Sequence, residues 1–243
     1  MVTSAPALRF RHVQVRYPGH ETPVLRELSL EVAAGERVAL LGLNGSGKTT
    51  LLLAAVGLIP FEGTIEIAGI ELSPRTVARV RERVGLLFAV PADQLLFPRV
   101  IDDVAFSLVR RRVPKPEARF RARGALENFA VADLADHSPF ELSHGQKTRV
   151  ALAGTMVTDP AVLLLDEPSA GLDPPGRLGL IRTLVSRNVS MLAATHDLEF
   201  ARRACQRAVL LEDGRLVDER ADLEALAKKW SAADGLPGGA GEG

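Results

Sequence analysis

The sequence predicts an α/β protein whose mostly parallel sheet core carries an N-terminal antiparallel β subdomain and an inserted helical subdomain. Strand-like and helix-like segments alternate at both ends of the chain, whereas only helix-period segments lie between Pro91 and about Thr158. Strands that alternate with helices are typical of parallel sheets covered by helices. The chain has 243 residues, a length that suits one large domain with a sub-lobe.

The domain boundaries are expected where alternating strands and helices give way to helices alone. We predict a single domain over residues 1–243, with an α/β core formed by 1–88 and 159–220 and a helical subdomain over 89–158. Residues 221–243 are expected to form a short C-terminal helix, at about 221–230, and a disordered tail. The tail sequence GLPGGAGEG favours flexibility.

The first 90 residues read mainly as strands. Alternation of apolar and polar residues, or short apolar runs between turn signals, predicts strands in this part. Helical spacing predicts two helices. The strands are expected at 8–17, 28–32, 37–41, 63–68 and 84–88, and the helices at 50–56 and 77–83.

The rest of the chain is read in the same way. A Pro at the first helical turn and Pro residues after helices help to set the ends. The Asp213-Gly214 pair predicts a hairpin turn. Helices are expected at 101–112, 116–129, 143–157, 174–187 and 198–204, and strands at 162–167, 190–194, 207–212 and 215–218.

The composition excludes several classes of protein. The formal net charge is zero, which argues against a dedicated nucleic-acid binder. Cys205 is the only cysteine, so a disulfide framework is impossible and a reducing cytoplasm is expected. The first ten residues do not resemble a signal peptide, and no run approaches the ~20 apolar residues of a membrane span. We expect a membrane to be reached only through a partner.

A phosphate-binding loop follows the strand predicted at 37–41. Its sequence, GLNGSGKT, matches G-x-x-x-x-G-K-[ST] and precedes a predicted helix. Glycines let backbone N–H groups point at phosphate oxygens, and the helix N-terminus adds positive charge. Lys48 is expected to reach the β- and γ-phosphates, and the Thr49 hydroxyl to bind Mg²⁺. The nucleotide-binding set is Gly42, Leu43, Asn44, Gly45, Ser46, Gly47, Lys48, Thr49 and Thr50.

Two adjacent carboxylates end the apolar strand VLLL. A P-loop needs a carboxylate from a neighbouring strand to help hold Mg²⁺, and Asp166 and Glu167 follow such a strand. One should hold the metal and the other should activate the attacking water. The alternative is a pair of turn carboxylates before Pro168, which the presence of the P-loop disfavours.

Together these motifs resemble those of the ATP-binding-cassette (ABC) ATPases, P-loop NTPases with a RecA-like core. GLNGSGKT resembles Walker A, VLLLDEP Walker B, and LSHGQ (142–146) the signature usually written LSGGQ. SAGLD (169–173) resembles the D-loop and THD (195–197) the switch histidine. Tyr17 resembles the aromatic residue that stacks on adenine. The resemblance covers about residues 8–220, with six motifs in the family's order.

The resemblance implies an ATPase that works as a head-to-tail dimer with two sandwiched ATP molecules. It implies catalytic roles for Lys48, for Glu167 as general base and for His196 near the γ-phosphate. It also implies adenine stacking by Tyr17, Mg²⁺ binding by Thr49 and Asp166, and a D-loop role for Asp173. Signature residues would act on the partner subunit's ATP: Ser143, His144, Gly145 and Gln146.

One position departs from the family pattern. The family usually has glutamine after Phe88, a residue that senses Mg²⁺ and the attacking water, and here Ala89 follows. Gln94 lies five residues on and could not take that place without rearrangement. Either the enzyme hydrolyses ATP with altered coupling or it pairs with a more complete ATPase. We favour a competent ATPase, because the base and metal ligands are intact, and expect Ala89→Gln to raise basal ATPase.

A finer resemblance points to the energy-coupling-factor (ECF) importers. PADQLLF (91–97) resembles a P-x-D-Q-L-F element of their ATPases, and LSHGQK is a common signature variant there. This implies docking on a transmembrane coupling subunit through Pro91, Asp93, Gln94 and Leu95, with a separate substrate-binding membrane subunit. The implied location is the cytoplasmic face of the membrane. The implied cargo is cobalt or nickel, with a vitamin such as biotin as the alternative.

Other readings stay open. The ATPase could form a homodimer or a heterodimer with a second ABC ATPase, and the short C-terminal extension suggests that dimerisation depends on ATP and on the membrane partner. A soluble ABC ATPase acting on nucleic acid is disfavoured, as is a nucleotide-binding module without turnover. The basic run at 110–123 reads as a solvated face or, less simply, as a contact with anionic lipid head groups. His144 reads as a tolerated occupant of a glycine position.

Overall fold

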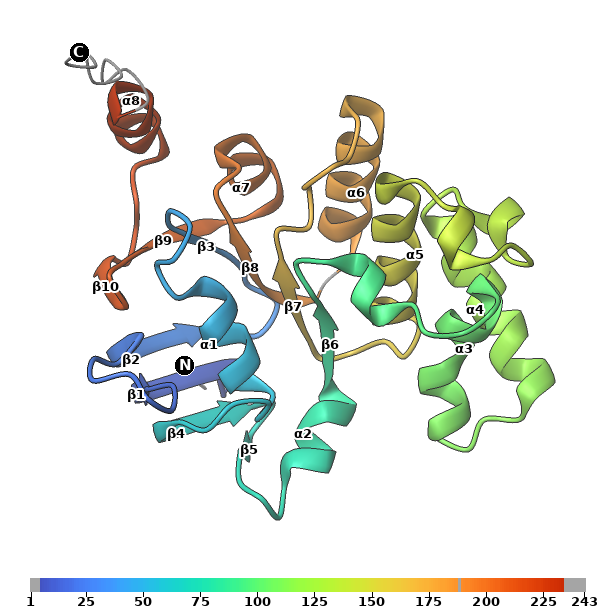
Figure 1. Ribbon diagram of the computed structural model, residues 1–243, viewed down its shortest axis with the longest axis horizontal. Helices are drawn as coiled ribbons and strands as arrows, with labels where there is room; N and C mark the ends of the chain where they lie inside the picture. Colours follow the sequence, from blue (N-terminus) through green and yellow to red (C-terminus); the bar gives the residue numbers. More distant parts are fainter. Residues whose placement is uncertain (1–4, 188, 234–243) are drawn as a thin grey trace, which may run out of the picture.

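The computed structural model describes residues 5–187 and 189–233 and contains two sheets with helices around the larger one (Figure 1). The smaller sheet is antiparallel in the order β2-β1-β4-β5. Its first strand covers the alternating segment that the sequence predicted. Its strands are β1 (Leu8–Val15), β2 (Leu25–Val32), β4 (Glu62–Ile67) and β5 (Ile70–Glu71).

The larger sheet is parallel except at one edge. Its order is β10-β9-β3-β8-β7-β6, and only β10 runs antiparallel to its neighbour. The strands are β3 (Arg37–Leu41), β6 (Val84–Leu87), β7 (Val162–Asp166), β8 (Ser190–Thr195), β9 (Arg207–Glu212) and β10 (Arg215–Asp218). Every residue of β7 and β8 is buried, which explains their continuous apolar sequences.

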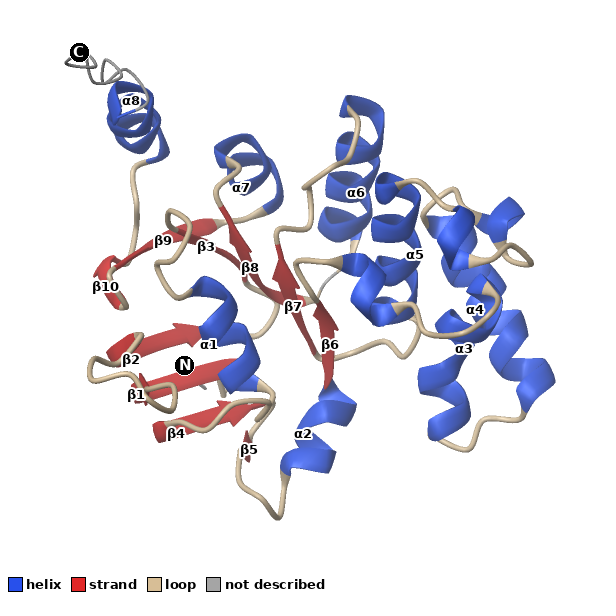
Figure 2. Ribbon diagram, in the orientation of Figure 1, coloured by secondary structure: helices blue, strands red, loops and turns tan. Residues whose placement is uncertain are grey.

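Helices cover both faces of the larger sheet and form a separate lobe beside β6 (Figure 2). Around the sheet lie α1 (Lys48–Ala55), α2 (Val77–Arg83), α6 (Pro174–Ser186), α7 (Leu198–Ala204) and α8 (Leu223–Ala233). The lobe contains η1 (Pro91–Gln94), α3 (Val100–Arg110), α4 (Lys115–Asn128), η2 (Ala132–Leu134), η3 (Pro139–Glu141) and α5 (His144–Met156).

In the described part of the chain, two large apolar cores and a smaller one, which packs α7 and α8 on β3 and β9, hold these layers together. One large core fills the space between the two sheets and α1, and includes Phe10, Leu40 and Leu51. The other large core joins β6, β7 and β8 to the helical lobe, to α6 and to α7, and includes Leu165 and Phe200. Burial of such side chains is the main favourable term in folding. The lobe is thus packed onto the sheet beside the ends of β6 and β7, where the predicted site residues lie.

The remaining expectations concern the ends of the chain and the membrane. The predicted C-terminal helix is present as α8, whereas the predicted disordered tail lies outside the described residues. Within residues 5–187 and 189–233, no helix combines the length and apolar character needed to cross a bilayer.

Candidate nucleotide site

The P-loop joins β3 to α1 in a conformation that requires its glycines. Gly47 has φ +106°, which side chains rarely adopt, and it precedes the first residue of α1. A Cβ on Gly42 would lie 2.5 Å from the Leu211 carbonyl oxygen. Leu43, Asn44, Gly45 and Thr49 are exposed, while Ser46 and Lys48 are buried. The loop therefore presents backbone and a buried cation at the N-terminus of α1, an arrangement that suits phosphate groups.

Lys48 and the Thr49–Asp166 pair lie together at the start of α1. Lys48 Nζ donates to the Gly42 and Leu43 carbonyl oxygens at 2.7 and 3.2 Å and lies 3.9 Å from Glu167 Oε1. Burial lowers the pKa of Lys48, opposed by the charges of Glu167 and Asp166. Thr49 Oγ1 donates to Asp166 Oδ2 at 2.6 Å. A hydroxyl and a carboxylate that meet here form a donor set that fits Mg²⁺, which prefers oxygen ligands.

Asp166 is the innermost carboxylate of the site. Burial raises its pKa above the ordinary value, and the nearby charge of Glu167 adds to this, while the Thr49 hydrogen bond and Lys48 oppose it. The carboxylate is 4% exposed. A buried charge of this kind calls for a counter-charge, which Lys48 supplies in part.

Glu167 directly follows β7, and its carboxylate makes three contacts at the end of β8. Its carboxylate accepts from Thr195 Oγ1 at 3.0 Å and from the His196 backbone N–H at 3.4 Å, and it lies 3.0 Å from His196 Nδ1. Its φ is +47°, a left-handed conformation uncommon for glutamate. Residues held this way are concentrated at functional sites. The geometry therefore fixes a carboxylate beside a histidine that is itself exposed.

Tyr17 and Thr50 border the loop on the side of the smaller sheet. The Tyr17 hydroxyl lies 3.3 Å from Thr50 Oγ1, so the predicted adenine-stacking residue touches α1. Its ring is half-buried and makes an edge contact with His20, at 6.4 Å between ring centres. The site residues from the N-terminal half are therefore brought together by β1, β3 and α1.

The signature residues begin α5, away from the P-loop. Ser143 caps the helix: its Oγ accepts from the Gln146 N–H at 3.3 Å, and Gln146 Oε1 accepts from the Ser143 N–H at 2.8 Å. In Figure 1 the start of α5 and the P-loop lie on opposite sides of β7. One chain therefore does not bring Ser143, His144, Gly145 and Gln146 onto its own P-loop.

His144 contacts the D-loop of its own chain, a feature that the sequence did not reveal. An ideal Cβ on Gly171 would lie 2.1 Å from His144 Cδ2, so the histidine ring occupies the space that Gly171 leaves free. Gly171 has φ +69°. Gly145 packs on the same segment, with 3.2 Å from its ideal Cβ to the Gly171 carbonyl oxygen. The expectation that His144 merely occupies a glycine position misses this contact.

The D-loop ends at the cap of α6. Asp173 Oδ1 accepts from the Gly176 N–H at 3.0 Å and caps the helix. Ser169 Oγ donates to Asp197 Oδ2 at 2.8 Å, so the D-loop also contacts the segment that carries His196. These bonds tie the D-loop to α6 and to the switch segment, and the packing of His144 on Gly171 joins the signature to them.

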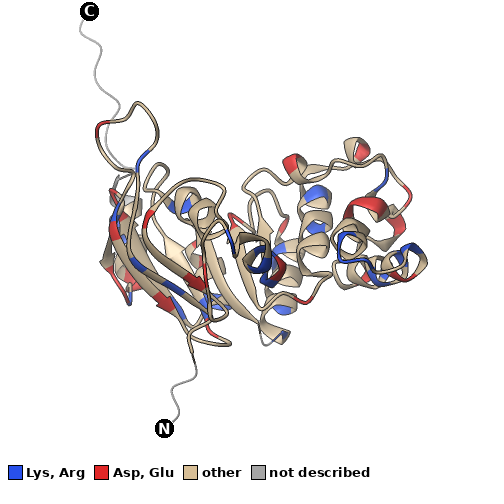
Figure 3. Cartoon of the chain, turned by 90° about the horizontal axis from the view of Figure 1, so that it is seen from below, with Lys and Arg blue, Asp and Glu red and all other residues tan. Residues whose placement is uncertain are grey.

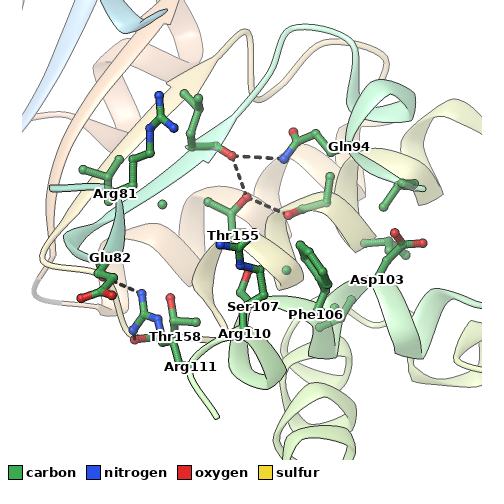
Figure 4. A pocket seen from close by; sticks show the side chains of 18 of the residues that line it. Arg81, Glu82, Gln94, Asp103, Phe106, Ser107, Arg110, Arg111, Thr155 and Thr158 are labelled. Atoms are coloured by element: carbon green, nitrogen blue, oxygen red, sulfur yellow. Dashed lines mark hydrogen bonds between the residues drawn. The ribbon is translucent and has the colours of Figure 1, made fainter. Parts of the chain in front are cut away.

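The predicted docking residues in the segment after β6 differ in exposure and in hydrogen bonding. Gln94 accepts from the Phe88 N–H at 2.8 Å and donates to the Leu86 carbonyl oxygen at 3.1 Å, which Thr155 Oγ1 also contacts (Figure 4). Pro91 and Leu95 are buried and Asp93 is exposed. Gln94 thus serves the end of β6 instead of facing outward, and Ala89 is exposed.

Comparison with known proteins defines the class first. The family model for ABC transporters matches residues 25–170, and the chain belongs to this family. A dimeric ATP-binding cassette bound to ADP and Pi is similar, with a TM-score of 0.80 and 26% identity over 88% of this chain and all of that one. The protein is therefore an ABC-type ATPase that binds and hydrolyses ATP.

Relatives with higher sequence identity define the group within the ABC family. The chain is 41% identical over 213 residues to the energy-coupling factor transporter ATP-binding protein EcfA1 of Levilactobacillus brevis, covering 86% of this chain and 76% of that protein. It is 42% identical to EcfA1 of Lacticaseibacillus paracasei, covering 86% and 77%. CbiO1 of Clostridium perfringens, described as part of the transporter complex CbiONQ, gives a TM-score of 0.80 and 32% identity over 95% and 94%. The chain is an ECF-type ATPase.

Proposed function

We propose that this ATPase hydrolyses ATP with Glu167 as general base and powers an ECF-type importer through membrane partners. The observation that carries the catalytic part is the position of Glu167, fixed by Thr195 and His196 next to the Thr49–Asp166 pair. A carboxylate fixed at the end of a parallel strand can accept a proton from water that attacks the γ-phosphate. His196, 60% exposed, would contact that phosphate.

The other residues of the site bind and orient the nucleotide. Lys48 exchanges its two carbonyl partners for phosphate oxygens, and the P-loop N–H groups hold the phosphates against α1. Thr49 and Asp166 hold Mg²⁺, which offsets the phosphate charge during transfer. Tyr17 stacks on the adenine. Since Ser143 and the α5 N-terminus lie away from the P-loop of their own chain, we assign them to the ATP of a second ATPase subunit.

The membrane partner docks, we infer, in a groove between the sheet and the helical lobe. This lobe groove has a volume of about 500 Å³ and lies between α2, β6, η1, α3 and α5. Asp103 lines it: Oδ1 accepts from the Leu96 and Phe97 N–H groups at 2.7 and 3.0 Å. Oδ2 is buried without a hydrogen-bond partner among the described residues, and burial raises the pKa of this carboxyl. A cationic side chain from a partner would satisfy it.

Substitutions in the lobe groove test the docking. Ser107→Trp places a large ring in the groove and should abolish co-purification with the membrane subunits while ATP binding persists. Leu178→Trp, at an exposed position on α6, is the matched control and should have no effect. Co-purification that survives Ser107→Trp would refute docking in the groove.

The cargo is proposed to be a transition metal ion, cobalt or nickel, with biotin as the second candidate. This rests on the group resemblance of PADQLLF and LSHGQK. The ATPase itself does not bind cargo in this scheme, since a separate membrane subunit does. Uptake of radiolabelled Co²⁺, Ni²⁺ and biotin by vesicles containing the assembled transporter separates the candidates, and uptake of biotin alone would exclude the metal proposal.

A further inference from the structure

The basic run in the helical lobe divides into paired and unpaired cations. Arg119 lies 2.6 Å from Asp102, and Arg123 lies 3.7 Å from Asp136. Arg121 pairs with Glu117 one helical turn away. By contrast, Arg110, Arg112 and Lys115 have no ion pair within the described part of the chain. Among the described residues, Arg111 has no ion pair either and donates only to backbone carbonyl oxygens. Three of the seven cations in the run are therefore neutralised by neighbouring carboxylates that the structure describes, and four are not.

The unpaired arginines gather with Arg83 around one cavity, which we name the arginine pocket. Its volume is about 600 Å³, and its lining residues are Glu82, Arg83, Arg110, Arg111, Arg112, Thr158, Asp159 and Ala161. Four arginines and two acidic residues thus line the pocket, and one of the acidic residues, Asp159, already lies 3.5 Å from Arg187. The pocket carries a local excess of positive charge, although the whole chain has none.

Arg111 holds together the helix ends that form the arginine pocket. Its guanidinium donates to the Glu82 carbonyl oxygen and, at 3.4 Å, to that of Thr158, so it links the ends of α2, α3 and α5 (Figure 4). Arg110 lies with its guanidinium 6.0 Å from the centre of the Phe106 ring. Phe106 and Val109 are exposed on α3. Cations beside exposed apolar side chains are typical of surfaces that meet lipid head groups.

The arginine pocket continues the lobe groove. Glu82, Arg110, Arg111 and Thr158 line both cavities. Figure 3 views the molecule from the end where α2 and the α3–α4 turn lie, and shows that turn largely in the colour of Lys and Arg. A partner in the groove would bring the pocket to the membrane side of the complex.

We propose that the arginine pocket binds the phosphate group of an anionic membrane lipid, with Arg83, Arg110 and Arg112 as the ligands. This rests on the proposed function, because the membrane subunit in the lobe groove positions the pocket. Guanidinium groups match phosphate oxygens with two parallel hydrogen bonds. Arg111 keeps its own contacts and shapes the site. The contact would orient the ATPase against the cytoplasmic leaflet, whose negative surface potential attracts clustered basic residues.

Vesicle flotation with the purified full chain tests the proposal. The wild type should bind vesicles that contain phosphatidylglycerol and not vesicles of phosphatidylcholine alone. The combined Arg83→Gln, Arg110→Gln and Arg112→Gln variant should bind roughly a hundredfold more weakly. The combined Arg119→Gln, Arg121→Gln and Arg123→Gln variant removes the same charge from paired positions and should keep binding within roughly threefold of the wild type. Equal losses in the two variants would overturn the proposal.

Two further measurements are needed. One distinguishes lipid phosphate from free phosphate as the ligand, and the other distinguishes loss of lipid binding from loss of docking on the membrane subunits. Inorganic phosphate at millimolar concentration should not displace the chain from vesicles, and binding of free phosphate with equal strength would overturn the assignment to lipid. Assembly with the membrane subunits in detergent should be unchanged in the pocket variant. If assembly fails instead, an acidic protein segment is the occupant and the lipid proposal is wrong. Ser107→Trp reports on the lobe groove independently, since its effect appears in detergent without lipid.

Discussion

Glu167 is the residue on which the catalytic proposal depends. Its left-handed backbone and its contacts to Thr195 and His196 hold the carboxylate in one place. Glu167→Gln keeps the size and most contacts but removes the proton acceptor. Phosphate release should fall by about 10²–10⁴-fold, the usual contribution of a positioned base, while ATP binding is retained. Turnover within a few-fold of wild type would assign the base elsewhere.

His144 and Gly171 form a pair whose coupling can be measured. The ring of His144 fills the space that a Cβ on Gly171 would need. Gly171→Ala should therefore cost more in the wild-type chain than in a His144→Ala chain, where only the positive φ opposes alanine. The wild type, the two single variants and the double variant form a double-mutant cycle. Residues in contact show interaction energies of about 0.5–3 kcal/mol in such cycles.

The cycle is read from kcat/KM and from ATP-driven association of the four proteins. Additive effects on both would mean that the contact has no role. A coupled effect on kcat/KM would show that the signature and D-loop segments are positioned together, in contrast to the interpretation of His144 as a tolerated occupant of a glycine position.

At the scale of single residues, the sequence predicted which residues form the site better than it predicted their contacts. The P-loop, Asp166, Glu167 and His196 were found from local motifs, and the structure brings them together. The His144–Gly171 contact joins segments 27 positions apart, and no local pattern signals it. The same holds for the ion pair of Arg119, which meets Asp102 on another helix.

Among the elements, η1 shows how a short segment is attached to the sheet. Gln94 gives two hydrogen bonds to the end of β6 and takes the place of a neighbouring strand there. Gln94→Ala should lower the free energy of unfolding by about 1–2 kcal/mol, since a net hydrogen bond contributes about 0.5–1.5 kcal/mol. Gln94→Glu keeps an acceptor for the Phe88 N–H but sets a carboxylate oxygen against the Leu86 carbonyl oxygen, so it should lose at least as much. Thermal denaturation of the two variants gives the comparison, and equal stability of Gln94→Ala and the wild type would show that the bonds add nothing.

Most elements were predicted closely because their apolar patterns and turn residues are clear in the sequence. The segments at 37–41, 77–83, 198–204, 207–212 and 215–218 match β3, α2, α7, β9 and β10, and the ends of the other predicted elements differ by at most three residues. The strand β5 and the turns η2 and η3 were missed. Two or three residues carry no periodicity, and their structure depends on the neighbours they pack against.

For the whole molecule we expect association that depends on ATP. The signature at the start of α5 and the P-loop of one chain lie apart, so each site needs a second subunit. The Glu167→Gln variant should be a monomer without nucleotide and a dimer with ATP and Mg²⁺, as measured by light scattering. A stable dimer without nucleotide would place the main interface away from the ATP site.

The most direct test of the completed site is complementation between two inactive variants. Lys48→Ala removes the phosphate ligand of a chain's own site, and Ser143→Arg blocks the site of its partner. Each variant alone should be inactive. Mixed in equal amounts, half of the dimers contain one intact site, so activity should return to about a quarter of the wild-type rate if sites act independently. No recovery in the mixture, with both variants folded and able to associate, would contradict a site shared between two subunits.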